Sequence, residues 1–114
     1  FDRAVALVHD LLAQKNPEVV IFSTIARHIQ RLYAAKLNEC AHGSEKELLT
    51  LLGSASPYYA RRIRTAAHRL PEHWLRQSVV LCGQTDAALK SSAADKQKLI
   101  ELTLLEMAAG LEQT

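Results

Sequence analysis

The chain has 114 residues, a formal net charge of +2 and a hydrophobic content of 48%, with only 4 Gly and 3 Pro. This composition suits one compact helical domain more than a β-sandwich or a disordered tail. So small a net charge permits nucleic acid as a partner without requiring it. The two cysteines, Cys40 and Cys82, are too few for the disulfide framework of a secreted protein. No run of about 18 apolar residues predicts a membrane span, and nothing at the start is typical of a signal peptide. We therefore expect a cytoplasmic protein.

The chain begins at Phe1 and its single methionine is Met107, which leads us to expect that it is part of a longer protein. It contains no internal repeat, no low-complexity tract and no linker long enough to separate two domains. We therefore expect residues 1–114 to form one domain.

The first half of the chain predicts two long helices. Residues 2–15 carry apolar side chains at helical spacing, and Asn16-Pro17 ends that run while starting the next, with Asn as N-cap and Pro in the first turn. The second run, from Glu18 to about Ala41, contains a stretch that alone could be a strand, but its apolar residues continue at intervals of three and four. His42-Gly43 is the expected end of this helix.

Three shorter-range signals predict the next two helices. Ser44 to Glu47 has the pattern of a capping box before a leucine-rich helix, and Gly53 is a natural C-cap. Ser56-Pro57 opens a fourth helix whose inner face is expected to hold the following apolar residues: Tyr59, Ile63, Ala66, Ala67 and Leu70.

The last third of the chain predicts two more helices. The fifth runs from about Pro71 to Lys90, and Asp95 caps a sixth, which is rich in leucine. Since no segment alternates as a strand does and the connections are short, we expect an all-α fold, a single compact bundle of about six helices.

One acidic residue falls on the apolar stripe of the fifth helix. On a helical wheel drawn from Leu75, Val79, Cys82 and Leu89 lie within about 40° of the start, and Asp86 lies among them at about 20°. Because a buried carboxylate needs a partner, we expect Asp86 to serve structure and assembly. Lys90, four residues on, is the nearest local candidate for a structural polar pair, and a donor from another helix is the expected main partner.

The fourth helix also supports a different function. Helix 57–70 carries Arg61, Arg62, Arg64 and Arg69, and no acidic residue lies between Glu47 and Glu72. With the preceding short helix and its glycine turn, it resembles a helix-turn-helix, in which guanidinium groups neutralise phosphates and the first turn, with Tyr58, approaches base edges. A DNA-binding module is therefore the alternative to a basic face that contacts protein or is simply solvated.

Catalytic and metal-binding patterns are not found. The histidines fall in different segments and form no zinc motif, and Cys40-Ala41-His42 supplies only two potential ligands. The chain has no phosphate-binding glycine loop and no nucleophile elbow. We expect no catalytic residue, cofactor, metal or small-molecule substrate. Four aromatic residues are expected as core or interface anchors: Tyr33, Tyr58, Tyr59 and Trp74.

Several segments together resemble one known family. Asp86, Leu89-Lys90-Ser91, Asp95 and the spaced leucines Leu99, Leu102 and Leu105 are similar to the closing motif of the C-terminal collar domain of the bacterial DNA polymerase III delta subunit. Phe22–Lys36 resembles the long arginine-containing helix of that family, and Glu47–Gly53 with Pro57 resembles its short helix and following turn. Ser91-Ser92-Ala93-Ala94 departs from the family, which often has a glycine after the Leu-Lys pair.

The resemblance to this family implies a fold, protein partners and further domains that the residues alone do not indicate. It implies a clamp-loader collar-type bundle that oligomerises with the tau or gamma and delta-prime subunits, in a loader that places the sliding clamp on primed DNA. It also implies two N-terminal AAA+-type domains in the complete subunit, and places contacts with the clamp and DNA in that missing part. The parent would then be a subunit of a DNA polymerase holoenzyme, with no enzymatic activity in this fragment.

Overall fold

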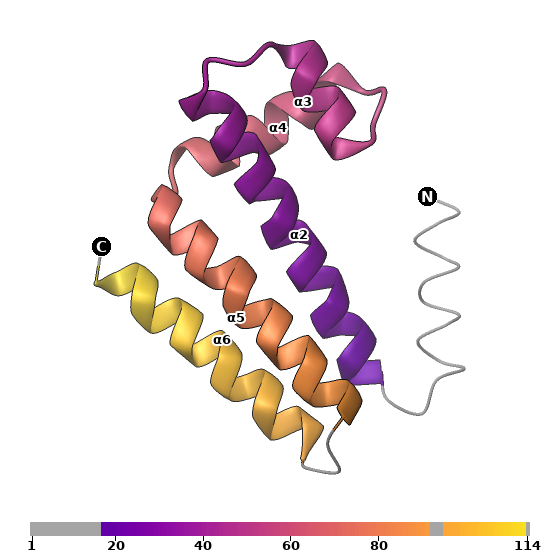
Figure 1. Cartoon of the computed structure of the whole chain (residues 1–114), viewed down its shortest axis with the longest axis vertical. Coiled ribbons are helices and arrows are strands. Elements are labelled where there is room, and N and C mark those ends of the chain that lie inside the picture. The colour runs from indigo at the N-terminus through magenta and orange to yellow at the C-terminus, as the bar shows by residue number, and fades with distance from the viewer. Residues whose placement is uncertain (1–16, 92–94, 114) are drawn as a thin grey trace.

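The computed structural model describes residues 17–91 and 95–113 of the chain, and these residues form five α-helices and no strand (Figure 1). The helices are α2 (Pro17–Cys40), α3 (Glu45–Leu52), α4 (Pro57–His68), α5 (Glu72–Ser91) and α6 (Lys96–Glu112). The predicted all-α fold is confirmed, and each of these helices was predicted to within two residues at its ends. The helix predicted for residues 2–15 and the turn at residues 92–94 lie outside the described residues.

Helix α2 is the centre of the fold, because it contacts α3, α4, α5 and α6. Its first half, α5 and α6 run side by side and alternate in direction, while α3 and α4 lie at the C-terminal end of α2 (Figure 1). The three long helices therefore form a bundle, and the two short ones cover one end of it.

The core takes residues from every described helix. The largest side chains with almost no exposed surface are Phe22 on α2, Leu48 on α3, and Leu75 and Leu89 on α5. Trp74 is also buried, at 8% exposed, and its indole N–H donates to the carbonyl oxygen of Met107 at 2.8 Å, which joins α5 to α6. Burial of each large apolar side chain contributes about 1.5–3 kcal/mol, so packing between helices, more than helix propensity, stabilises the fold.

Four predicted caps are confirmed, and the N-cap predicted at Asn16 lies outside the described residues. Ser44, Ser56 and Asp95 have extended backbones, and the side-chain oxygen of each accepts a hydrogen bond from the backbone N–H three residues later, at 3.1, 3.3 and 3.2 Å. Gly53 ends α3 in the left-handed conformation, with φ of 64°. These contacts satisfy backbone groups that a helix end otherwise leaves unpaired.

The end of α2 differs in detail from the expected His42-Gly43 stop. His42, and not the glycine, takes the left-handed conformation, with φ of 55°. Gly43 is needed for another reason: its backbone N–H donates to Asn38 O at 2.8 Å, and a Cβ at this position would collide with the Asn38 side chain. Close approach of the chain to α2 therefore requires glycine at 43.

The inner face of α4 is rotated slightly from the predicted one. Ile63 and Ala67 are buried as expected, and Ala60 is buried with them, whereas Ala66 is exposed. The prediction for Ala66 was wrong because the buried stripe consists of Ala60, Ile63 and Ala67, and Ala66 lies beside it, about 60° from Ile63 and about 100° from Ala67 on the helical wheel.

Candidate functional site

The outer face of α4 brings together three of the four arginines predicted to form a basic face. Arg61, Arg62 and Arg69 are exposed and line one shallow hollow with Tyr58 and Thr65. The Tyr58 side chain is 67% exposed, and the Arg62 guanidinium carbon lies 5.9 Å from the centroid of its ring. A planar aromatic ring beside several guanidinium groups is a surface that can contact an anionic polymer.

Arg64 does not belong to this face. Its Nη2 donates to Oδ1 of the buried Asn38 at 3.0 Å, and its Nε is buried with no hydrogen-bond partner among the described residues. The Asn38 Nδ2 in turn donates to Ser44 O at 3.2 Å. Arg64 and Asn38 thus join α4 to α2 and to the turn before α3. The predicted four-arginine face was wrong for this residue because the long side chain reaches inward from the edge of the helix.

Further contacts from α2 hold both ends of α4. At its start, Arg31 Nη1 donates to the Tyr59 hydroxyl at 3.2 Å. At its end, Lys36 Nζ donates to the carbonyl oxygen of His68 at 3.3 Å, and His68 Nδ1 lies 2.5 Å from Glu39 Oε1. These contacts fix which side of α4 faces solvent, so the outward direction of Arg61, Arg62 and Arg69 is a property of the fold.

The Glu39–His68 contact also changes the pKa of the Glu39 carboxyl group. The hydrogen bond with His68 is the main cause that lowers the pKa of Glu39 below its ordinary value of 4.5, and it outweighs the opposing effect of desolvation. Nearby positive charges on His68, Lys36 and Arg64 act in the same direction. The end of α4 is therefore held best when Glu39 is ionised.

Asp86 forms an ion pair, although not in the surroundings that were expected. Its Oδ2 lies 2.9 Å from Lys90 Nζ, one helical turn away, and its side chain is 34% exposed. The buried stripe of α5 consists of Leu75, Ser78, Cys82, Thr85 and Leu89 with Trp74, so Asp86 lies at the edge of the core. Among the described residues its ionic partner is Lys90, and the donor expected from another helix is not found.

The α5–α6 interface contains polar groups that the sequence analysis did not single out. The hydroxyls of Thr85 and Thr103 are both buried and lie 2.6 Å apart, and Cys82 Sγ lies 3.8 Å from Met107 Sδ. Burial raises the pKa of the Cys82 thiol, which makes it a small core residue and not a reactive one. Spacing of three and four from Leu75 and Ser78 to Cys82, Thr85 and Leu89 is the signal that could have placed Thr85 in the core.

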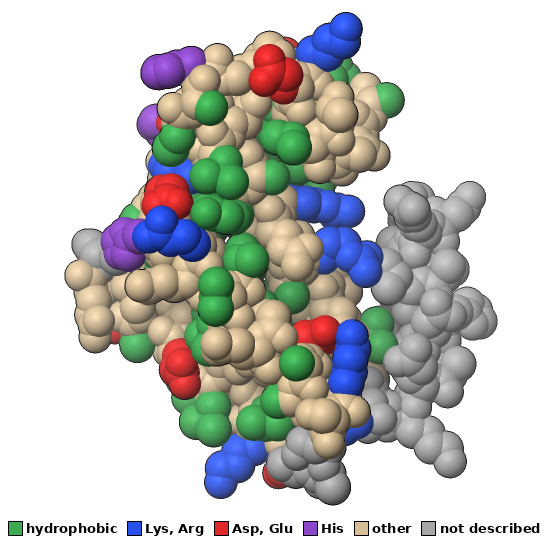
Figure 2. All heavy atoms as spheres, in the orientation of Figure 1, with side chains coloured by type: hydrophobic (Ala, Val, Ile, Leu, Met, Phe, Trp, Pro, Cys, Tyr) green, Lys and Arg blue, Asp and Glu red, His purple; other side chains and the backbone are tan. Residues whose placement is uncertain are grey.

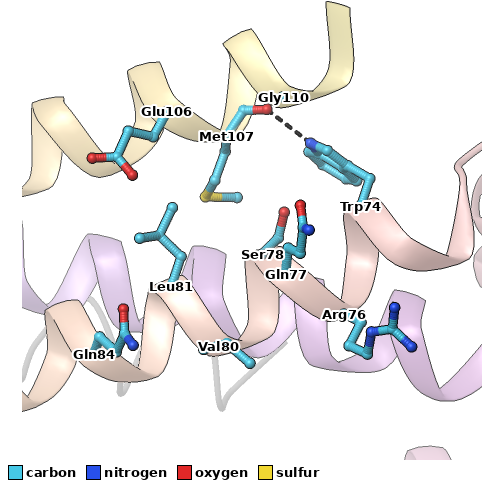
Figure 3. Close-up of a pocket in the computed structure, with 10 residues that line it drawn as sticks. All are labelled: Trp74, Arg76, Gln77, Ser78, Val80, Leu81, Gln84, Glu106, Met107 and Gly110. Carbon is cyan, nitrogen blue, oxygen red and sulfur yellow. Dashed lines mark hydrogen bonds between the residues drawn. The ribbon is translucent and has the colours of Figure 1, made fainter. Parts of the chain in front are cut away.

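A pocket of about 410 Å³ lies between α5 and α6 (Figure 3). Figure 3 shows Trp74 toward one end of it, Leu81 and Glu106 toward the other, and the Met107 side chain between them. Of the polar side chains around it, Ser78 is buried, whereas others such as Gln77, Gln84 and Glu106 are exposed. It offers no convergent set of polar groups for a small ligand.

Metal binding and membrane insertion find no support within residues 17–91 and 95–113. No three His, Cys, Asp or Glu side chains in these ranges lie close enough to hold a metal ion. No helix in the same part of the chain has the length and hydropathy required to cross a bilayer.

These observations define a small all-helical domain that exposes basic side chains on α4 and apolar side chains on α6. Residues 1–107 match the family model of the DNA polymerase III delta subunit, C-terminal domain, and the chain belongs to this family. The resemblance read from the sequence is confirmed. A search of curated proteins and a search of solved structures found no match.

Proposed function

We propose that this domain is a collar-type oligomerisation domain, through which a delta subunit assembles with the tau or gamma and delta-prime subunits of the clamp loader. The family match carries the proposal, because the delta subunit is a clamp-loader component. In this proposal residues 1–114 act as one domain of a cytoplasmic protein. AAA+-type domains elsewhere in the subunit contact the sliding clamp and primed DNA, and this domain itself performs no catalysis.

The exposed apolar side chains support a role in assembly. Within residues 17–91 and 95–113, nine large hydrophobic residues are exposed, and four of them lie on α6: Leu102, Leu104, Leu105 and Leu111. Helices that bury one side in their own bundle and keep leucines on the other can pack against neighbouring helices. Figure 2 shows hydrophobic side chains among the charged ones on the part of the surface formed by α5 and α6.

The test is reconstitution with separately purified tau or gamma and delta-prime subunits. On size exclusion, the chain is expected to co-elute with these subunits. If the folded chain elutes alone at every concentration and the full-length delta subunit assembles, the oligomerising surface lies in another part of the subunit and the proposal is wrong.

The basic face of α4 supports a second function, contact with the DNA backbone. Its support is the exposure of Arg61, Arg62 and Arg69 beside Tyr58. The inward position of Arg64 reduces the face to three phosphate contacts, which weakens the helix-turn-helix alternative as a sequence-specific reader. Three contacts to duplex DNA predict a salt slope of about −2.7 in log K against log salt, and the loss of each contact reduces its size by about 0.9.

Fluorescence anisotropy with labelled duplex DNA tests this function. Arg61→Ala, Arg62→Ala and Arg69→Ala are each expected to reduce the salt slope. Arg27→Ala is the matched control, because Arg27 is exposed on α2 and is not one of the residues that line this face. An equal effect of the control and the three face variants would show that only net charge matters and would remove the basic face as a site.

A further inference from the structure

Helix α4 carries one straight row of side chains on its solvent side, which we call the α4 strip. Four exposed residues form it, at intervals of four, three and four along the sequence: Tyr58, Arg62, Thr65 and Arg69. On a helical wheel these positions fall within about 60° of each other, opposite the buried residues of α4. The α4 strip therefore follows the helix axis for about 16 Å, with an aromatic ring in the first turn and a guanidinium group at the end.

The two arginines of the α4 strip are not neutralised within the described part of the chain. Neither Arg62 nor Arg69 has an ion-pair partner there, and no acidic side chain lines the hollow that they share with Tyr58. Arg61, at the side of the strip, donates from Nε to the carbonyl oxygen of Pro57 at 3.3 Å, which holds it beside the same hollow. The hollow therefore suits a ligand that brings several negative charges.

Tyr58 adds a flat apolar surface to these charges. The residue is 67% exposed, and the Arg62 guanidinium carbon lies 5.9 Å from the centroid of its ring. Among the described helices, α4 contacts α2 and α3, and both lie on the side away from the strip. A tyrosine ring that is held beside an arginine and open to solvent can stack on the flat face of a nucleobase.

The lining of the hollow favours a single nucleic-acid strand over an acidic peptide or a duplex. No aliphatic residue larger than Ala66 lines it, so it has no pocket for the apolar anchor on which a peptide interface depends. In a duplex each base is stacked between its neighbours, and the face of a base becomes accessible only if the stack is opened at a cost in free energy. An unpaired strand offers phosphates to the arginines and a base face to the ring at the same time.

We propose that the α4 strip binds an unpaired stretch of DNA, with one base stacked on Tyr58 and neighbouring phosphates on Arg62 and Arg69. This inference rests on the second proposed function, contact of α4 with the DNA backbone, and names the form of DNA that fits the surface. Since stacking accepts every base, little sequence preference is expected. Helices α4 and α6 make no contact among the described residues, so the strip is separate from the exposed leucines of α6.

Fluorescence anisotropy of the full 114-residue chain at low salt, with three labelled probes of equal length, tests the stacking. The probes are oligothymidylate, an abasic strand with the same phosphates, and a duplex. Oligothymidylate is expected to bind at least about fivefold more tightly than the abasic strand. Tyr58→Ala should remove this difference without weakening the abasic strand or the duplex, whereas Tyr58→Phe keeps the ring and should keep the difference. Leu51→Ala is the matched control, since Leu51 is 60% exposed on α3 and does not line the hollow.

Arginine variants separate this inference from the function on which it rests. Arg62→Ala and Arg69→Ala should weaken the binding of all three probes, with each variant shown to be folded by circular dichroism. If no probe responds to them, the basic face is not a DNA site and both proposals fail. If they weaken every probe while Tyr58→Ala binds oligothymidylate as tightly as the wild type, backbone contact stands and the stacking is overturned. A glutamate peptide of equal charge that binds as tightly as oligothymidylate would indicate an acidic protein partner and would also overturn it.

Discussion

Replacement of Asn38 by alanine should destabilise the domain more than most single substitutions on α2. The Asn38 side chain is 5% exposed and bridges two elements: it donates to Ser44 O at 3.2 Å and accepts from Arg64 Nη2 at 3.0 Å. A neutral hydrogen bond contributes about 0.5–1.5 kcal/mol and a charged one about 1.5–3 kcal/mol, which gives roughly 2–4.5 kcal/mol for both. Because Arg64 keeps partial access to water, we expect Asn38→Ala to lower the free energy of unfolding by about 2–3 kcal/mol.

Urea denaturation followed by circular dichroism at the helix band measures this loss. For a domain of 114 residues, a loss of 2–3 kcal/mol corresponds to a decrease in the melting temperature of about 8–12 °C. Asn38→Asp keeps the acceptor for Arg64 but loses the amide donor to Ser44 O, so its effect should be smaller. Gln30→Ala, at an exposed position on the same helix, is the control and should change stability by less than about 0.5 kcal/mol.

A double-mutant cycle then isolates the contact between the two side chains. Asn38→Ala and Arg64→Ala should be less destabilising together than the sum of the single variants, with a coupling of about 1–3 kcal/mol. Loss of amide protection should concentrate in α3 and α4, because Asn38 holds these helices to α2. If Asn38→Ala stays within about 0.5 kcal/mol of the wild type, the bridge does not contribute to stability and the reasoning is refuted.

Three further predictions follow from local geometry. Gly53→Ala should lower the free energy of unfolding by about 1–2 kcal/mol through its left-handed backbone alone, since no atom lies near the new methyl group. Gly83→Ala, inside α5, should raise it by about 0.5–1 kcal/mol, and equal effects of the two variants in urea denaturation would contradict this. The pKa of Glu39 lies below 4.5, so its contribution to stability is fully present above pH 4.5 and is lost as the pH falls through the lowered pKa. NMR titration of the His68→Ala variant should show a higher pKa for Glu39, and an unchanged pKa would exclude the contact. Asp86→Ala should lower the free energy of unfolding by only about 0.2–0.5 kcal/mol in thermal denaturation, because its partner Lys90 lies one turn away and is exposed. A loss above about 1 kcal/mol would favour the buried position first expected for Asp86.

Helices and their ends were predictable from the sequence because their signals are local. A serine or aspartate before an apolar run, and a glycine after one, determine hydrogen bonds within four residues. Ser44, Gly53, Ser56 and Asp95 therefore all cap as expected. The two departures are small: the left-handed residue is His42, one position before the expected glycine, and Ala66 lies about 60° around the helix from the buried Ile63.

The surfaces were less predictable because they depend on contacts between helices. Arg64 turns away from the other arginines only because Asn38, 26 residues earlier, offers an acceptor inside the fold. Thr85 and Thr103 enter the core because each satisfies the other. A helical wheel places a residue on a side of its own helix, but it does not state which side a neighbour covers, and so Asp86 was assigned to the core instead of its edge.

Binding of this chain to the other clamp-loader subunits is the most direct test of its assignment as an assembly domain. Cys40 is exposed and Cys82 is buried, so a maleimide dye labels the folded chain selectively at Cys40. Sedimentation velocity of the labelled chain should show a faster-moving species that saturates as tau or gamma and delta-prime subunits are added, and excess unlabelled chain should compete for it. A labelled chain that is folded by circular dichroism and sediments as free chain at every subunit concentration would contradict the central claim.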